Sequence, residues 1–134
     1  MELPQLAALL AAALIAAVAA FQLALAVGAP YGEAVFGGKA RTESGVLTPP
    51  FRALAVVQAA VLMLLGWVLL ARVEVVDIPL VGAGGLRAIT WGILAFLVLN
   101  TAANLTAPHP LERFGMGSIT AVLSVLTLVI AVSG

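Results

Sequence analysis

Residues 3–32 read LPQLAALLAAALIAAVAAFQLALAVGAPYG, a stretch without a charged side chain. About 20 apolar residues cross the ~30 Å hydrocarbon core of a bilayer as a helix, so this stretch is long enough for one span. Three more charge-free stretches follow, at residues 53–71, 88–111 and 114–134. The sequence therefore predicts an all-α membrane protein, a four-transmembrane-helix up-down bundle in a single domain of residues 1–134, with spans near residues 4–29, 51–71, 87–106 and 114–133.

The composition supports this class and excludes several others. Hydrophobic residues make up 63% of the chain and charged residues 9%, against about 25% charged in soluble domains. The net charge of zero argues against nucleic acid as a partner, since binding phosphates requires clustered Lys and Arg. The lack of cysteine excludes disulfides and thiolate-ligated metals, and we expect no cofactor. The segment Met1–Gln5 has no Lys or Arg, so we interpret the first apolar run as a retained span.

The three connections between the spans differ in character. The first loop, residues 30–50, is long, and its apolar Tyr31, Val35 and Phe36 alternate with glycines, which favours a segment that dips back onto the bundle. The second loop holds a glycine run at residues 82–85, which we interpret as a flexible turn because it lacks the Lys and Ser/Thr of a phosphate-binding loop. The third, residues 108–110, is short enough to make the third and fourth spans antiparallel neighbours.

Polar side chains inside the spans fall at one depth. At ~1.5 Å per residue, Gln22 lies about 10 Å before the end of the first span, Gln58 about 9 Å after the start of the second, and Asn100 about 9 Å before the end of the third. Asn104 follows Asn100 by one helical turn, on the face that carries Ile93 and Leu97. An amide facing lipid would be unpaired, so we predict a shallow polar pocket that opens toward the first and third loops, with the opposite half of the bundle dry and tightly packed.

Charged and aromatic residues of the two odd-numbered loops would form the rim of this pocket. Glu33 with Arg52, and Glu112 with Arg113, could pair there as interfacial salt bridges or contact a ligand. His109 is a lone histidine between two prolines, so we expect no metal site. The predicted ligand-binding residues are therefore Gln22, Tyr31, Glu33, Arg52, Gln58, Asn100, Asn104, Glu112 and Arg113.

The carboxamides have other interpretations. Asn and Gln also join membrane helices through interhelical hydrogen bonds of about 0.6 kcal/mol on average, and such packing is an alternative to binding. A conduction path would ordinarily need an ionisable group in the membrane interior, where this sequence has none.

Two segments resemble those of small four-helix integral membrane proteins from GC-rich bacteria: residues 28–38, with Gly28-Ala29-Pro30-Tyr31-Gly32-Glu33 and Gly37-Gly38, and residues 100–113, ending in Leu111-Glu112-Arg113. The resemblance implies a fold and a membrane location, and it carries no activity. Small multidrug exporters share the size and span count but have an acidic residue in the middle of the first span, where this sequence is aliphatic at residues 14–18.

The favoured function is that of a small integral membrane protein, not an enzyme, whose pocket takes a small amphipathic ligand or a partner subunit. The alternative is a small-solute transporter or channel that acts as a dimer, because four helices enclose little volume alone. An enzymatic alternative would use Glu33, His109 and Glu112 as surface acid or base groups, but no nucleophile, base and orienting group can be assembled from these residues.

The partners expected are the lipid bilayer and either a second copy of the chain or a larger membrane complex. Basic residues predict the orientation in the cell membrane. The odd-numbered loops hold four of them, against two on the other side, which favours cytoplasmic odd-numbered loops and both termini outside. These six are Lys39, Arg41, Arg52 and Arg113 against Arg72 and Arg87.

Overall fold

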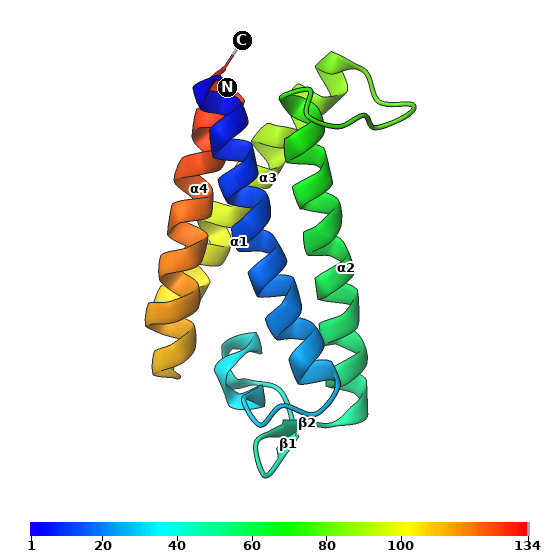
Figure 1. Ribbon diagram of the computed structural model, residues 1–134. Helices are drawn as coiled ribbons and strands as arrows, with labels where there is room; N and C mark the ends of the chain where they lie inside the picture. Colours follow the sequence, from blue (N-terminus) through cyan, green and yellow to red (C-terminus); the bar gives the residue numbers. More distant parts are fainter. Residues whose placement is uncertain (134) are drawn as a thin grey trace.

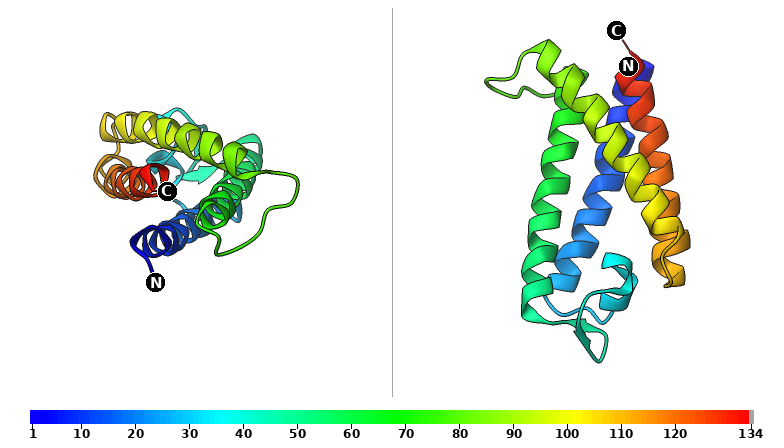
Figure 2. Two further views of the ribbon diagram at one scale, coloured as in Figure 1. Left: turned by 90° about the horizontal axis from the view of Figure 1, so that it is seen from above. Right: turned by 180° about the vertical axis from the view of Figure 1, so that it is seen from behind.

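The computed structural model describes residues 1–133 and consists mainly of four long helices (Figure 1). In chain order the elements are α1 (Leu3–Ala26), η1 (Gly32–Ala34), η2 (Phe36–Gly38), β1 (Thr42–Glu43), β2 (Val46–Leu47), α2 (Pro49–Arg72), α3 (Ala83–Leu105), η3 (Leu111–Met116) and α4 (Gly117–Val132). The helices alternate in direction, and the two ends of the chain lie together at one end of the bundle (Figures 1 and 2). The predicted all-α four-helix bundle is confirmed.

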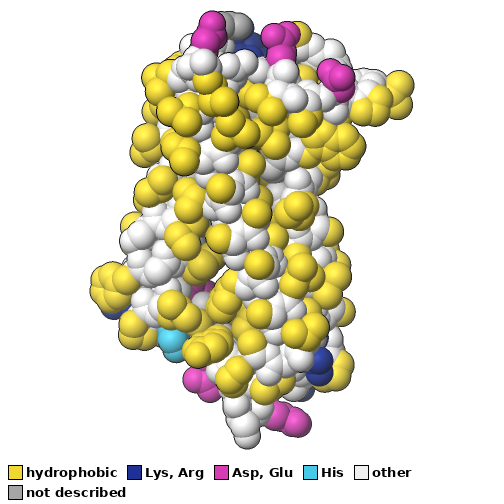
Figure 3. Space-filling model, viewed as in Figure 1, with side chains coloured by type: hydrophobic (Ala, Val, Ile, Leu, Met, Phe, Trp, Pro, Cys, Tyr) yellow, Lys and Arg dark blue, Asp and Glu magenta, His cyan; other side chains and the backbone are white. Residues whose placement is uncertain are grey.

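Each long helix has the length and composition of a membrane span. The four candidate spans are Leu3–Ala26, Pro49–Arg72, Ala83–Leu105 and Leu111–Val132, the last of which joins η3 to α4. Acidic and basic side chains gather at the two ends of the molecule, and apolar side chains cover the flank between them (Figure 3). The chain is therefore a small multi-pass membrane protein with an apolar surface where lipid would contact it.

Two helix boundaries that lie at glycines differ from the predicted ones. Helix α1 ends at Ala26, three residues before the predicted position 29, because Gly28 adopts a φ of +113° that a helix cannot continue through. Helix α3 begins at Ala83, so the prediction of a flexible turn at residues 82–85 is wrong. Gly82 is the N-cap, and Gly84 and Gly85 lie in the first helical turn, although all three are exposed.

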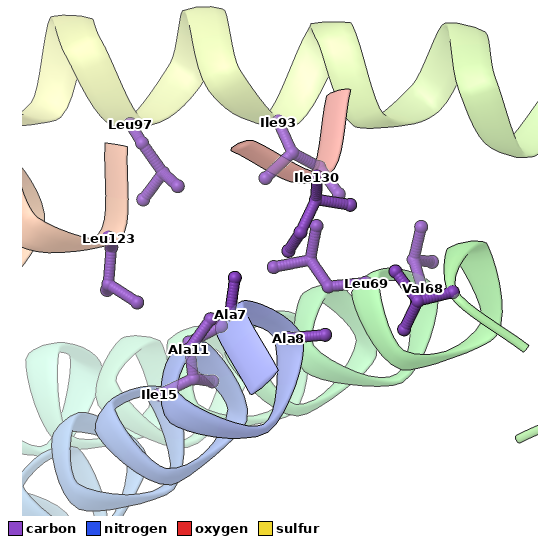
Figure 4. Packing of buried hydrophobic residues seen from close by; sticks show 11 residues of the cluster. Ala7, Ala8, Ala11, Ile15, Val68, Leu69, Ile93, Leu97, Leu123 and Ile130 are labelled. Atoms are coloured by element: carbon purple, nitrogen blue, oxygen red, sulfur yellow. The ribbon is translucent and has the colours of Figure 1, made fainter. Parts of the chain in front are cut away.

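A tight apolar core fills the half of the bundle near the termini (Figure 4). Small residues of α1 let the backbones approach closely, and larger side chains from α2, α3 and α4 point into the space beside them. Ile93 and Leu97 are buried, which confirms that their face of α3 is the inward one. The fully buried members include Ala8, Ala11, Leu69 and Ile130.

The end of the bundle where the two chain termini lie is open, contrary to the prediction that this half is dry and tightly packed. A cavity of about 530 Å³ lies there, with a lining that includes Glu2, Arg72 and Asp77. The α2–α3 connection, which extends sideways from the bundle (Figure 2), forms part of the wall of this cavity.

The third and fourth spans are neighbours, as the short connection predicts. A Cβ added at Gly117 would lie 2.7 Å from the Leu105 side chain, so glycine permits the close approach of α3 and α4. The small residues of α4 form the packing face: Gly117, Thr120, Thr127 and Ala131 are buried. The π-helical turn of η3 precedes this face and starts the fourth span three residues earlier than predicted.

The first loop folds onto the end of the bundle. Its antiparallel β1–β2 hairpin turns at Ser44 and Gly45, whose φ values of 52° and 83° match the type I′ turns that suit short hairpins. Val35 and Leu47 are buried, 4% and 2% exposed, against Leu25 of α1 and Ala55 of α2. The expectation that the first half of the loop dips back onto the bundle holds for Val35, whereas Tyr31 is 54% exposed.

Candidate functional site

A cavity of about 570 Å³ lies between the four helices at the end covered by the first loop. Val18 and Gln22 line it from α1, and the other helices and the loop complete the wall. Val61 of α2 and Phe96 of α3 also line it and are 45% and 47% exposed, so the cavity reaches the flank of the bundle. Figure 3 shows a hollow in this half, with an acidic side chain at its base.

The structure brings together the carboxamides that were predicted to share one depth. Gln22, Gln58 and Asn100 come from three different helices and all line the cavity. Gln22 is 5% exposed, whereas Gln58 and Asn100 are half-buried. The Gln22 side-chain oxygen is buried and has no hydrogen-bond partner within residues 1–133. An unsatisfied polar atom of this kind costs about 1–3 kcal/mol.

The orientation of the Asn104 side chain follows from its contact with Thr120. The Thr120 hydroxyl donates to the Met116 carbonyl at 2.9 Å, so its oxygen can only accept from Asn104. The Asn104 Nδ2 group therefore donates to Thr120 Oγ1, at 3.3 Å. The Asn104 carbonyl oxygen, on the other side of the amide, has no hydrogen-bond partner within residues 1–133, and Asn104 lines the cavity.

Glu112 is the acidic residue of the cavity wall. It lies in η3, is 4% exposed, and both of its carboxylate oxygens accept from the Gly37 backbone N–H, at 3.0 and 3.3 Å. It belongs to the first turn of the fourth span, where unpaired backbone N–H groups favour a negative charge. Single π-turns are frequent at functional sites because the extra residue changes where side chains point.

The first loop closes the aqueous end of the cavity. Val35, Phe36, Gly37 and Lys39 contribute to the lining. Phe36 has a φ of 55°, which side chains rarely adopt, and its ring lies 5.9 Å from the ring of Phe51 in α2. The aromatic contact and the Gly37–Glu112 hydrogen bonds hold this conformation from two sides.

Four of the residues predicted to bind a ligand lie outside the cavity lining. Tyr31 and Glu33 are exposed on the loop. The Arg52 Nε donates to the Ala26 carbonyl at 2.7 Å, and the Arg113 Nε donates to the Ala107 carbonyl at 2.9 Å. The Arg52 bond caps the end of α1, whereas Ala107 lies in the third loop just after α3. Both arginines thus donate to backbone carbonyls and not to the expected partners, Glu33 and Glu112.

His109 also makes a hydrogen bond within its own loop. Its Nδ1 accepts from the Leu111 backbone N–H at 3.1 Å, which stabilises the third loop. Within residues 1–133, no group of three or more His, Cys, Asp or Glu side chains could hold a metal ion.

Sequence reasoning predicted five of the lining residues, Gln22, Gln58, Asn100, Asn104 and Glu112, and missed the rest, among them Phe36, Gly37, Lys39 and Thr120. Thr120 carried a signal, since it belongs to the small-residue stripe of α4 that packs toward α3. Phe36 belongs to the apolar part of the loop that was expected to dip back onto the bundle, whereas Gly37 and Lys39 carried no signal, because their position depends on how the loop folds.

Comparison with known proteins identifies no relative. No protein-family model, no curated protein and no solved structure matches the chain.

Proposed function

We propose that this membrane protein binds a small amphipathic molecule in the cavity between its helices and is not an enzyme. The observation that carries the proposal is the convergence of three carboxamides on one cavity, with the Gln22 oxygen buried and unpaired. Amides that served only to join the helices would hydrogen-bond to each other or to backbone carbonyls. Here the three amides instead line a cavity that opens to the flank of the bundle.

The lining of the cavity has a polar part and an apolar part, as the binding of an amphipathic ligand requires. Its volume of about 570 Å³ falls within the range of about 300–1,000 Å³ of small-molecule sites. Polar atoms of Gln22, Asn104 and Glu112 can receive a head group. An apolar chain would contact the aliphatic and aromatic part of the wall, formed by Val18, Val61, Leu62, Phe96, Leu97 and Leu123.

The chemistry of the wall supports binding over catalysis. The hydroxyl of Thr120 donates to a helix carbonyl, and no Ser, Cys or His is among the lining residues of the described chain. Glu112 therefore has no nucleophile beside it to activate.

Single-cysteine labelling tests the proposal, because the natural chain has no cysteine. Ala103 and Ala102 are adjacent and exposed on α3, but only Ala103 lines the cavity. With Ala103→Cys in phosphatidylcholine nanodiscs, we expect a twelve-carbon amphiphile to slow the reaction with N-ethylmaleimide. The matched Ala102→Cys protein should react at an unchanged rate.

Equal rates at both positions with every amphiphile would overturn the proposal. The sequence analysis also allowed a partner subunit as the occupant of the pocket. Native mass spectrometry of gently purified protein would detect such a subunit. Flux of small solutes through liposomes that contain the protein would contradict a binding role and favour the dimeric transporter.

A further inference from the structure

We infer that the cavity selects amphiphiles whose head group is a primary ammonium. The inference rests on the proposed binding function and adds the chemical class of the ligand. It follows from a count of hydrogen-bond donors and acceptors around the polar end of the cavity.

The Glu112 carboxylate lacks donors. An ionised carboxylate has about four lone-pair sites, yet within residues 1–133 its one donor is the Gly37 N–H, which the two oxygens share. The side chain is 4% exposed, so water supplies little of the missing solvation. A buried charge of this kind is stable only when it is paired and hydrogen-bonded.

Two amide oxygens add acceptor capacity to the same cavity. The Asn104 amide group is committed to Thr120, which leaves its Oδ1 as an acceptor. The Gln22 Oε1 is buried without a donor. The groups short of donors are therefore the Glu112 carboxylate and the Gln22 and Asn104 oxygens, whereas the half-buried Gln58 and Asn100 amides of the same lining carry both donors and acceptors.

A primary ammonium matches this set, because it carries a positive charge and three donors on one small atom. A quaternary ammonium has the charge without donors, an alcohol has one donor without the charge, and a carboxylate would be repelled by Glu112. Lys39 also lines the cavity, but it is exposed, so water screens its charge more than that of buried Glu112.

The experiment compares four head groups on one alkyl chain. Dodecylamine, dodecyltrimethylammonium, dodecanol and dodecanoate are each added to the Ala103→Cys protein in phosphatidylcholine nanodiscs, and protection from N-ethylmaleimide gives the affinity. We expect dodecylamine to bind at least about tenfold more tightly than the other three, as expected for hydrogen bonds to a charged group.

Two variants, each of which replaces one carboxylate by an amide, test whether Glu112 causes the preference for an ammonium head group. Glu112→Gln retains the size of the side chain and an acceptor for Gly37, and it should bring dodecylamine to within about twofold of dodecanol. Glu33→Gln removes an exposed carboxylate outside the cavity and should leave the preference intact. The wild-type head-group series needs no substitution at Glu112, so it decides the question even where Glu112→Gln fails to fold.

The outcomes separate the two proposals. Equal protection by all four amphiphiles, or a preference for dodecanoate, overturns the ammonium inference and leaves the binding function standing. Protection by none of them overturns the binding function and the inference with it.

The ammonium could come from a lipid or from a free amine. Replacing part of the phosphatidylcholine by phosphatidylethanolamine distinguishes these sources. Protection by the lipid without added amphiphile identifies an aminophospholipid head group, and protection by dodecylamine alone identifies a free amine. Both results support the inference.

Discussion

The Gly37 backbone nitrogen lies 3.0 Å from a carboxylate oxygen of Glu112, although 75 positions separate the two residues in the chain. This bond joins the first loop to the start of the fourth span. It places a buried carboxylate in the wall of a cavity whose other polar groups come from α1, α2, α3 and α4. The loop and the binding site are therefore parts of one structure.

Removing the Glu112 carboxylate should release the first loop. We expect Glu112→Ala to lower the free energy of unfolding by about 1–3 kcal/mol, because a hydrogen bond to a charged group is lost. Hydrogen exchange should quicken in residues 31–47 and remain slow in the interior of α1 and α4. Glu33→Ala is the control, and an equal effect there would show that the Gly37 contact does not hold the loop.

The Gln22→Leu variant distinguishes a role of Gln22 in ligand binding from a purely structural role in helix packing. Since the Gln22 oxygen is buried without a partner, leucine should raise the thermal stability of the ligand-free protein, by about 1 kcal/mol, and weaken amphiphile binding. Thr127→Val removes a buried hydroxyl that also has no partner among the described residues but lies outside the cavity lining, so it should leave binding unchanged. A loss of stability in Gln22→Leu would instead indicate that Gln22 joins the helices through hydrogen bonds.

Gly32 permits the close packing of the loop on its own hairpin. An added Cβ would lie 2.8 Å from the Gly45 carbonyl oxygen and 2.8 Å from the Leu47 side chain. We therefore expect Gly32→Ala to destabilise the protein by about 1–3 kcal/mol, the usual range for overpacking. Gly92→Ala meets nothing within 4 Å and should be tolerated. Thermal unfolding of both variants in the same nanodiscs checks this, and equal midpoints would contradict the close contact.

Arg52 links the second span to the end of the first. Its Nε donates to the Ala26 carbonyl at 2.7 Å, so Arg52→Gln should leave that carbonyl under-satisfied and cost about 1–3 kcal/mol of stability. Amphiphile binding should persist, because Arg52 does not line the cavity. Arg41→Gln changes an exposed arginine of the first loop and serves as the control. Loss of binding in folded Arg52→Gln would mean that the arginine contacts the ligand.

Orientation in the membrane can be read from two single cysteines. The charge distribution favours a cytoplasmic first loop, so an impermeant maleimide should label Ser44→Cys in inside-out vesicles and Asp77→Cys in right-side-out vesicles. Both positions are exposed, one in the β1–β2 turn and the other in the second loop. The reverse pattern would place the termini in the cytoplasm.

Some of this structure is local enough to be predicted from the sequence. The exclusion of charge from stretches of about 20 residues predicts the four spans, and the helical period predicts that Asn100 and Asn104 share the inward face of Ile93 and Leu97. The common depth of Gln22, Gln58 and Asn100 follows from the rise per residue, and all three line one cavity.

The partners of the rim residues were decided by the tertiary structure. Arg52 and Arg113 donate to the backbone carbonyls of Ala26 and Ala107 instead of to the nearby glutamates, and Tyr31 and Glu33 are exposed. The contact between Gly37 and Glu112 could not be predicted, because it depends on the path of a loop with no periodic pattern. Depth along a helix is a property of one segment, whereas the position of a loop or the emptiness of a cavity depends on how several segments pack together.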